Sequence, residues 1–189
     1  MRRTAALALA LLALSALLAG PTAAKVHRSE FWSWSGPASW QASYGAYGIT
    51  ISSPTGGSAL DLGFSSVLCT PGASVQASVN AYFAEQRRRL RQGARILSSG
   101  PVRAAPRLGQ NYFRQAIEIA ARVNGIPVRG SVTYDYQVPD PTYCYQRSLL
   151  LHAPARGFGA GFNQVLDVYK SLAYFGPGTD EGSAPNVTE

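Results

Sequence analysis

Histidine and cysteine are scarce in this chain of 189 residues, which contains two of each. The histidines are His27 and His152 and the cysteines are Cys69 and Cys144, so there is no C-x-x-C pair and no cluster with metal-ligand spacing. Hydrolase motifs of the G-x-S-x-G, S-x-x-K and H-E-x-x-H types are absent as well. The sequence therefore predicts no metal site, no redox pair and no cofactor.

His152 is the one histidine that falls inside a predicted element, at the end of a strand. A histidine at this position could act as a general base with Asp167 or a nearby serine. A lone histidine beside leucines at a strand end is more often structural. His152 is thus a weak catalytic candidate, and a small secreted hydrolase that uses it stays open as an alternative.

The first 24 residues have the features of a signal peptide. Arg2 and Arg3 give a positive start, residues 5–19 are small and apolar apart from Ser15, and residues 22–24 offer small side chains to a signal peptidase. The run is shorter than a membrane span, which needs about 20 apolar residues. We therefore predict a mature chain that begins near Lys25, has no transmembrane segment and is secreted or periplasmic.

Cys69 and Cys144 form the only possible cysteine pair of this chain. Disulfides form and persist in the oxidising compartments that exported proteins reach, so a bond between the two is expected. Closing a loop of this length stabilises a fold by about 4 kcal/mol in the chain-entropy model.

The formal net charge is +7, and arginine supplies nearly all of the positive charge because Lys25 and Lys170 are the only lysines. A basic exported protein can meet anionic lipids, wall polymers or nucleic acid, and ordinary solubilising charge has the same composition. The densest basic run lies on a predicted helix, where we expect a solvated face or an anion-binding patch made by Arg87, Arg88 and Arg91. The partner expected for that patch is an envelope component, an anionic polymer or another protein, without specific recognition of nucleic acid.

A helix is predicted where alternating periodicity gives way to helical periodicity at Ser74. Ser74 is a good N-cap residue, and apolar residues follow it at helical spacing up to Gly93. Strands are predicted before and after this helix, over residues 47–52, 60–69 and 94–99.

Asn124-Gly125 separates two runs of alternating polar and apolar residues. This pair is preferred in two-residue hairpin turns because both positions tolerate a positive φ. With Val123 opposite Ile126, one face of the hairpin is apolar, and the other face sets Arg114 opposite Asp135. We expect that ion pair to be exposed and worth about 0 to 1 kcal/mol.

Residues 142–153 form a last predicted strand that contains three consecutive leucines, Leu149 to Leu151. Successive side chains of a strand point to opposite faces, so both faces are apolar at this end and both must be covered. Glycines at 157, 159 and 161 predict a flexible connection to a final helix that stops at Gly176. Residues 177–189 are acidic without apolar periodicity and are predicted to be a disordered tail.

The predicted order of elements is strand, strand, helix, four strands, helix, and the chain closes on SLLLHAPARGFGAGFNQVLDVYKSLAYF. Over residues 45–176 this order and the closing pattern, with its isolated Phe158 and a helix ending near Phe175, resemble the Mog1/PsbP-like α/β/α sandwich family. The resemblance implies an α+β domain with an antiparallel sheet of about six strands covered by helices on both sides. It also implies a non-enzymatic binding, assembly or envelope role. A cystatin-like or NTF2-like curved sheet wrapped on a helix is the alternative fold.

Residues 25–44, ahead of that domain, have little regular pattern but contain all three tryptophans, Trp32, Trp34 and Trp40. Aromatic side chains bury large areas, whereas contiguous exposed apolar surface marks interaction sites. We expect Trp40 to be packed and Trp32 or Trp34 to be partly accessible and to contact a ligand. These features together predict an exported, non-catalytic binding or accessory protein of the bacterial envelope or extracellular space, with the hydrolase as the alternative.

Overall fold

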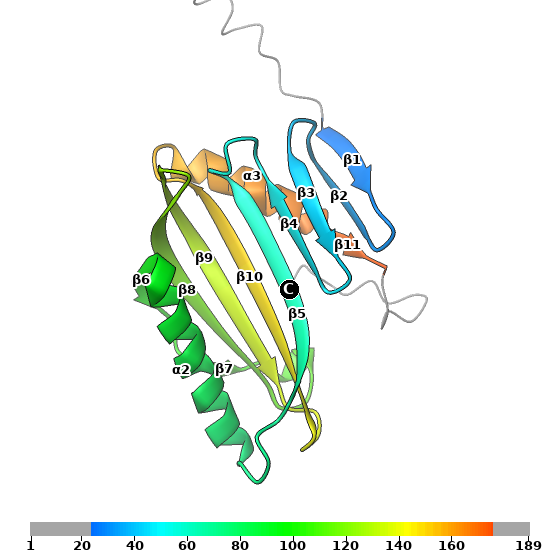
Figure 1. The fold of residues 1–189 in the computed structure, drawn as a ribbon, viewed down its shortest axis with the longest axis vertical. Helices are drawn as coiled ribbons and strands as arrows, with labels where there is room; N and C mark the ends of the chain where they lie inside the picture. Colours follow the sequence, from blue (N-terminus) through cyan, green and yellow to red (C-terminus); the bar gives the residue numbers. More distant parts are fainter. Residues whose placement is uncertain (1–23, 176–189) are drawn as a thin grey trace, which may run out of the picture.

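The large sheet of the protein is antiparallel and eight-stranded, as seen in a computed structural model that describes residues 24–175 (Figure 1). Its strands follow the order β3-β4-β5-β10-β9-β8-β6, and β7 pairs with β8. A second sheet of three strands has the order β1-β2-β11. The bounds of the strands are β1 Ala24–Arg28, β2 Trp32–Pro37, β3 Gln41–Gly45, β4 Gly48–Ser52, β5 Ala59–Leu68, β6 Ala94–Ser99, β7 Arg103–Ala104, β8 Tyr112–Val123, β9 Ile126–Gln137, β10 Tyr143–Pro154 and β11 Ala173–Tyr174.

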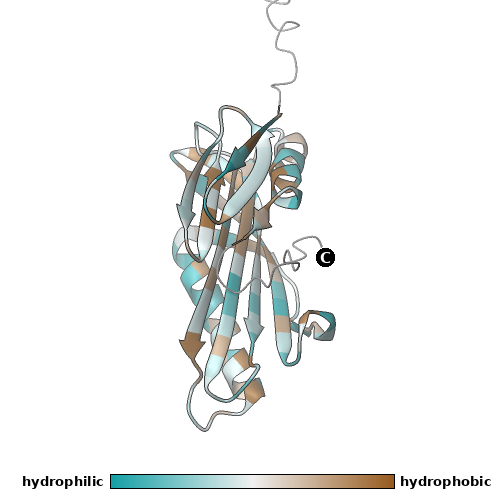
Figure 2. Ribbon diagram, turned by 90° about the vertical axis from the view of Figure 1, so that its right-hand side faces the viewer, coloured by the Kyte–Doolittle hydropathy of each residue, from teal (hydrophilic) through white to brown (hydrophobic). Residues whose placement is uncertain are grey.

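The α-helices of the described chain, α2 (Val75–Gly93) and α3 (Phe158–Lys170), lie on opposite sides of the large sheet (Figure 2). A short 3₁₀ helix, η1 (Pro106–Leu108), lies between β7 and β8. Two core clusters follow the alternation of side chains along the strands. The strand residues of the cluster on the α2 side come mainly from β8 and β9, and those of the cluster on the α3 side come from β2, β4, β5 and β10. Each helix therefore covers its own face of the sheet, and β10, which also gives Cys144 and Leu150 to the α2 side, contributes to both clusters.

The prediction of a sheet of about six strands in a ββαββββα order is wrong, because the described chain is mostly β and has eleven strands in two sheets. The strands that the prediction lacked are β1, β2, β3, β7 and β11. Three of them come from the aromatic segment before residue 45, which was expected to have little regular structure. β7 and β11 are two residues long and form by pairing with β8 and β2, and strands this short have no periodicity of their own.

Helix α2 begins and ends where the sequence predicts. The Ser74 hydroxyl accepts a hydrogen bond of 3.2 Å from the backbone N–H of Ala77, and the helix runs to Gly93. Its buried stripe contains Val79 and Phe83, which pack over β8 and β9. The N-cap and the apolar spacing thus fix both the position of the helix and the face it turns to the sheet.

The hairpin of β8 and β9 has the predicted turn and the predicted register. Asn124 and Gly125 have φ angles of 50° and 79°, the left-handed values that this turn requires. Val123 pairs with Ile126, and Arg114 pairs with Asp135. The turn therefore decides which side chains of the two strands share a face.

The leucine end of β10 is covered on both faces, as predicted. Leu149 and Leu151 are each 6% exposed in the cluster that includes α3, and Leu150 packs against the cluster on the α2 side. Three consecutive leucines are compatible with a strand only in such a position between two layers.

Helix α3 starts earlier and ends earlier than predicted. It includes the glycines that were interpreted as a flexible connection, and only Gly157, with φ of 74°, stands before it in a left-handed conformation. A Cβ atom at Gly161 would lie 3.2 Å from the Cβ of Ala153, so glycine permits close packing of the helix on β10. Residues 173–174 leave the helix to form β11, which is why the predicted stop at Gly176 is wrong.

The two predicted terminal segments fall largely outside the described residues. Of the predicted signal peptide, residues 1–24, only Ala24 is described, and it opens β1. The predicted tail, residues 177–189, lies wholly outside the described part.

Candidate functional site

Cys69 and Cys144 are joined by a disulfide, as predicted, with their Cα atoms 5.2 Å apart. Cys144 belongs to β10, and Cys69 directly follows β5, its neighbour in the sheet. The bond ties these two strands together at the end of the sheet far from the leucines of β10.

The expectation that Trp32 or Trp34 is partly accessible is wrong. Both side chains are 1% exposed, and Trp40 is 5% exposed, packed as expected. The indole N–H of Trp32 donates to the Gly45 carbonyl, and that of Trp34 donates to the Tyr44 hydroxyl. Alternation along β2 turns both tryptophans toward α3, so neither can contact a ligand in this conformation.

His152 lies in a buried position of β10 and is 6% exposed. Its Nδ1 is 3.1 Å from the Gly57 carbonyl oxygen, which can only accept, so Nδ1 carries a proton in this contact. Burial lowers the pKa of His152. The predicted partner Asp167 has an exposed side chain near Lys170, so the structure does not bring the two residues together. This arrangement gives no support to the hydrolase alternative.

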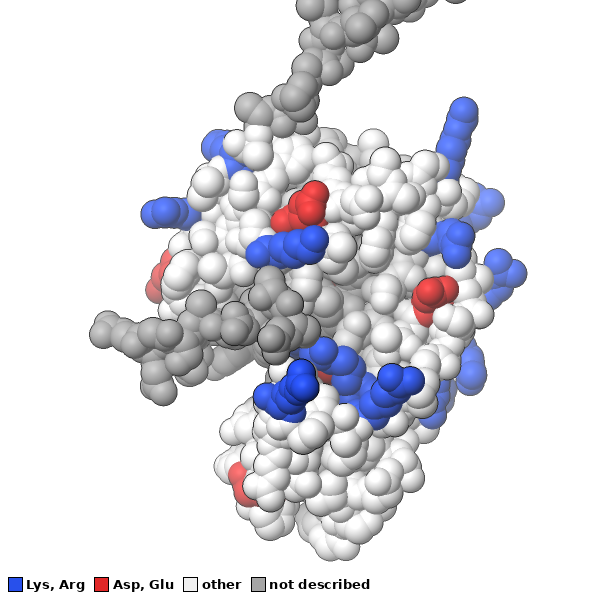
Figure 3. Space-filling model, turned by 180° about the vertical axis from the view of Figure 1, so that it is seen from behind, with Lys and Arg blue, Asp and Glu red and all other residues white. Residues whose placement is uncertain are grey.

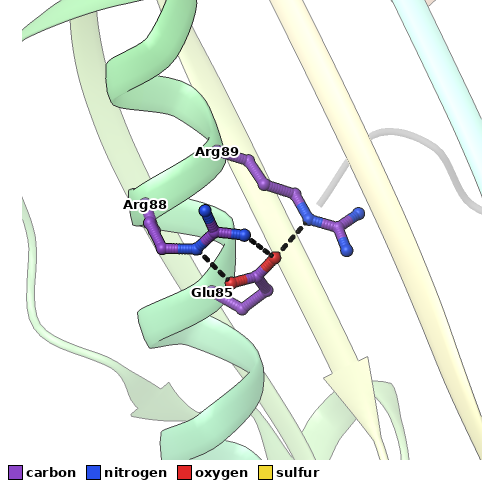
Figure 4. A network of polar contacts seen from close by, with 3 residues as sticks. All are labelled: Glu85, Arg88 and Arg89. Carbon is purple, nitrogen blue, oxygen red and sulfur yellow. Dashed lines mark hydrogen bonds and ion pairs between the residues drawn. The ribbon is translucent and has the colours of Figure 1, made fainter.

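The arginines of α2 do not converge on one point. Arg87 donates to the side-chain oxygen of Gln115 on β8 at 2.9 Å. Arg88 donates twice to Glu85, which also accepts from Arg89 at 2.6 Å (Figure 4). These hydrogen bonds lower the pKa of Glu85 to about 2, so the carboxylate neutralises part of the basic run. Arg91 is exposed in the last turn, and an anion-binding role for Arg87, Arg88 and Arg91 stays a prediction.

A groove of about 770 Å³ lies on the α3 side of the large sheet, beside the part that α3 covers. We call it the tyrosine groove. Its aromatic wall consists of Tyr47, Phe64, Tyr112, Tyr145 and Tyr174, and its charged side chains are Asp135 and Arg147. Other lining residues are Ser65, Ser66, Tyr136, Gln137 and Gln146.

The antiparallel register of β8, β9, β10 and β5 brings the groove residues together from four strands. One row across the sheet contains Arg114, Asp135, Arg147 and Phe64 in directly paired positions. The next row toward the open end contains Tyr112, Gln137, Tyr145 and Ser66. Paired residues point to the same face, so these side chains form one continuous surface.

Asp135 lies between two arginines in the first of these rows. Its carboxylate accepts from the Nε of Arg114 at 2.7 Å, from Nη2 of the same side chain at 3.3 Å, and from the Nε of Arg147 at 2.8 Å. Asp135 is 1% exposed, whereas the side chains of Arg114 and Arg147 are 29% and 19% exposed. The expectation of an exposed pair is therefore wrong, because the third strand adds Arg147 and covers the carboxylate.

Arg114, Asp135 and Arg147, which we call the Arg-Asp-Arg row, have a net charge of +1. Arg103 of β7 pairs with Arg114 in the register and adds a further cation at its side. Figure 3 shows basic side chains gathered near the middle of this face of the molecule. Burial and the nearby Asp135, which it hydrogen-bonds, raise the pKa of Tyr112 to about 12, so its hydroxyl is neutral at physiological pH.

The aromatic wall is anchored to the core on one side and open on the other. The Tyr174 ring lies 4.6 Å from that of the buried Trp32 and 6.3 Å from that of Phe64, and its hydroxyl donates to the Ala46 carbonyl. Tyr47 and Tyr145 are 65% and 48% exposed. The groove thus combines a rigid apolar side with accessible aromatic surface and a cationic floor.

Sequence reasoning identified Arg114 and Asp135 as partners but missed Arg147 and Tyr145. A signal was present in the run TYCYQR, where tyrosine and arginine alternate with other residues and so share one face. The pattern does not say what lies above that face, which is why the groove was not predicted.

No protein-family model matches the chain, and no curated protein matches it. Among solved structures, LpqN of Mycobacterium tuberculosis, described as involved in cell envelope biogenesis, aligns over 82% of this chain and 86% of its own, with a TM-score of 0.45 and 9% identity. A protein of Bacteroides thetaiotaomicron aligns over 78% of this chain and 46% of its own, with a TM-score of 0.32 and 10% identity. The chain thus spans about half the length of the second protein. Likenesses this distant do not assign a family or a function, and the resemblance to the Mog1/PsbP family is not confirmed by them.

Proposed function

We propose that the protein is an exported, non-catalytic binding protein of the bacterial envelope or extracellular space, and that it holds a small ligand in the tyrosine groove. The observation that carries the proposal is the groove itself, about 770 Å³ in volume, in which the aromatic wall lies beside the charged side chains of Asp135 and Arg147. Ligand sites commonly measure about 300 to 1,000 Å³ and combine apolar walls with a few placed polar groups.

The chemistry of the groove favours binding over catalysis. The carboxylate of Asp135 is occupied by two arginines, and the pKa of Tyr112 is about 12, so neither is suited to act as a base near neutral pH. The described lining residues include two serines, Ser65 and Ser66, but no histidine that could activate them. Among residues 24–175, moreover, no group of three or more histidine, cysteine, aspartate or glutamate side chains is placed to hold a metal ion.

Export is supported by the disulfide between Cys69 and Cys144, since such bonds persist in oxidising compartments. The predicted signal peptide agrees with this location. Within the described residues, no helix is both long and apolar enough to cross a membrane.

Titration with Nile red, a neutral apolar dye, tests whether the groove binds ligands. We expect a saturable rise in fluorescence with one dye per protein. Replacing Tyr47 and Tyr145 together by alanine should weaken binding about tenfold, the equivalent of about 1.4 kcal/mol, because both rings are accessible in the groove.

Tyr143→Ala is the matched control, because Tyr143 lies two residues from Tyr145 on β10 and is 49% exposed but does not line the groove. It should leave dye binding unchanged. Absence of saturable binding, or equal loss in the double variant and the control, would refute the proposed function.

A further inference from the structure

We propose that the ligand of the tyrosine groove is an amphipathic monoanion, an aliphatic chain with one terminal carboxylate. The carboxylate binds the outer edge of the Arg147 guanidinium, and the chain lies against the aromatic wall. This inference rests on the proposed function and specifies the ligand class of the same groove.

Arg147 presents an unused pair of donors to the groove. Asp135 takes only its Nε–H, at 2.8 Å, and among the described residues no hydrogen bond engages its Nη1 or Nη2. These two nitrogens form the second fork of the guanidinium, whose spacing matches the two oxygens of a carboxylate. The side chain is 19% exposed, so the donors are accessible and yet partly removed from water, where a charged hydrogen bond is stronger than at an open surface.

The charge balance of the groove fits a single negative charge. Among the described residues, Arg147 and Asp135 are the only charged ones that line it, and Asp135 is also paired with Arg114. The Arg-Asp-Arg row as a whole is therefore one positive charge in excess. A carboxylate brings one negative charge and balances that excess, whereas a phosphate monoester brings about −1.5 to −2 at pH 7 and would need Arg103, which does not line the groove, as a second cation.

The aromatic wall beside Arg147 favours a ligand with an apolar part. Phe64 is paired directly with Arg147 in the register, and its ring lies 6.3 Å from that of Tyr174. Phe64 has no hydrogen-bonding group, and the Tyr174 hydroxyl already donates to the Ala46 carbonyl. An aliphatic chain needs only apolar surface of this kind, and each methylene that becomes buried strengthens binding about fourfold.

Competition with Nile red on the full mature protein tests this inference, with dodecanoate as the probe at concentrations where it is monomeric. Dodecanol and dodecyltrimethylammonium carry the same chain with no charge or the opposite charge, and acetate carries the head without the chain. We expect dodecanoate to displace the dye at a concentration at least about tenfold lower than either analogue. Acetate should not displace it, and octanoate should be weaker than dodecanoate.

Arg147→Gln should remove the preference for dodecanoate over dodecanol, measured as the ratio of the two displacing concentrations within the same variant. Arg95→Gln, at an exposed arginine of β6 outside the groove, is the matched control and should keep the preference. If Arg147→Gln fails to fold, Arg147→Lys, which keeps the charge but loses the fork, should reduce the preference instead.

Equal affinities of the wild-type protein for dodecanoate and dodecanol, or a preference that persists in Arg147→Gln, would overturn the inference and leave the proposed function standing. A concentration-dependent dimer that excludes both dye and dodecanoate would show that a second copy fills the groove, which also overturns it. Failure of Nile red itself to bind would instead refute the proposed function.

Discussion

The two ends of strand β10 differ sharply although they share one face of one sheet. Leu149 and Leu151 are each 6% exposed beneath α3, whereas Tyr145, four residues before Leu149, is 48% exposed and lines the tyrosine groove. Alternation along the strand places all three on the same face. The face of a residue is thus a property of the strand, but its burial depends on the element that lies above it.

The two ends also use different interactions to hold neighbouring strands together. At the leucine end the strands share an apolar cluster with α3 and the tryptophans of β2. At the open end the Arg-Asp-Arg row links β8, β9 and β10, and the disulfide links β5 to β10. Polar and covalent links thus stabilise the part of the sheet that no helix covers on this side, and this leaves the face accessible to a ligand.

Removal of the disulfide should have the largest effect on the difference between the two ends of β10. Replacing Cys69 and Cys144 together by alanine should lower the free energy of unfolding by about 4 kcal/mol, because the bond closes a long loop of the unfolded chain. Urea denaturation measures the total decrease in the free energy of unfolding.

Hydrogen exchange of the variant without the disulfide shows which part of β10 loses stability. Amides of residues 143–147 should lose protection before those of residues 149–153 in the variant, since only the former lie next to the missing bond. Uniform loss along β10 would show that the two ends are not energetically distinct.

A matched pair of substitutions on β10 tests the contrast directly. Leu149→Ala should cost about 3 kcal/mol of unfolding free energy, because it leaves a cavity beneath α3. Tyr145→Ala should cost less than about 1 kcal/mol, because its ring is half exposed. Chemical denaturation of the two variants provides the measurement, and similar costs for both would mean that the groove end is packed by something the structure does not contain.

The smallest expected effect on stability comes from the titration of His152. It concerns only the end of β10 that α3 covers. Burial lowers its pKa in the folded protein below the unfolded value of about 6.5, so the unfolded chain binds more protons in acid. The stability that results is present above pH 6.5 and is lost as the pH falls below it.

The free energy of unfolding should therefore fall between pH 7 and pH 5, and it should fall less in His152→Asn, whose amide can still donate to the Gly57 carbonyl. The pKa of His27 is also lowered by burial, so a smaller slope of the same sign should remain. An unchanged pH dependence in His152→Asn would contradict the assignment.

Local sequence determined those parts of the protein whose geometry depends on neighbouring residues. Asn124-Gly125 accepts positive φ at both positions, and this alone set the turn, the register of β8 and β9, and the pairing of Arg114 with Asp135. Ser74 and the apolar spacing behind it determined helix α2 in the same way. Scarcity of cysteine made the disulfide predictable without any geometry, because only one pair exists.

Tertiary structure alone decided which surfaces are covered. The sequence pattern places Trp32 and Trp34 on one face of a strand, but only the packing of β2 beside α3 buries them. Likewise, Arg147 joins Asp135 because β10 pairs with β9 in one register. The connection 138–142 between them contains the turn-forming Pro139-Asp140-Pro141 but no two-residue hairpin turn such as Asn124-Gly125, so its sequence predicts that the chain turns and not which residues pair. Register across such a connection and the cover over a face depend on contacts between distant residues.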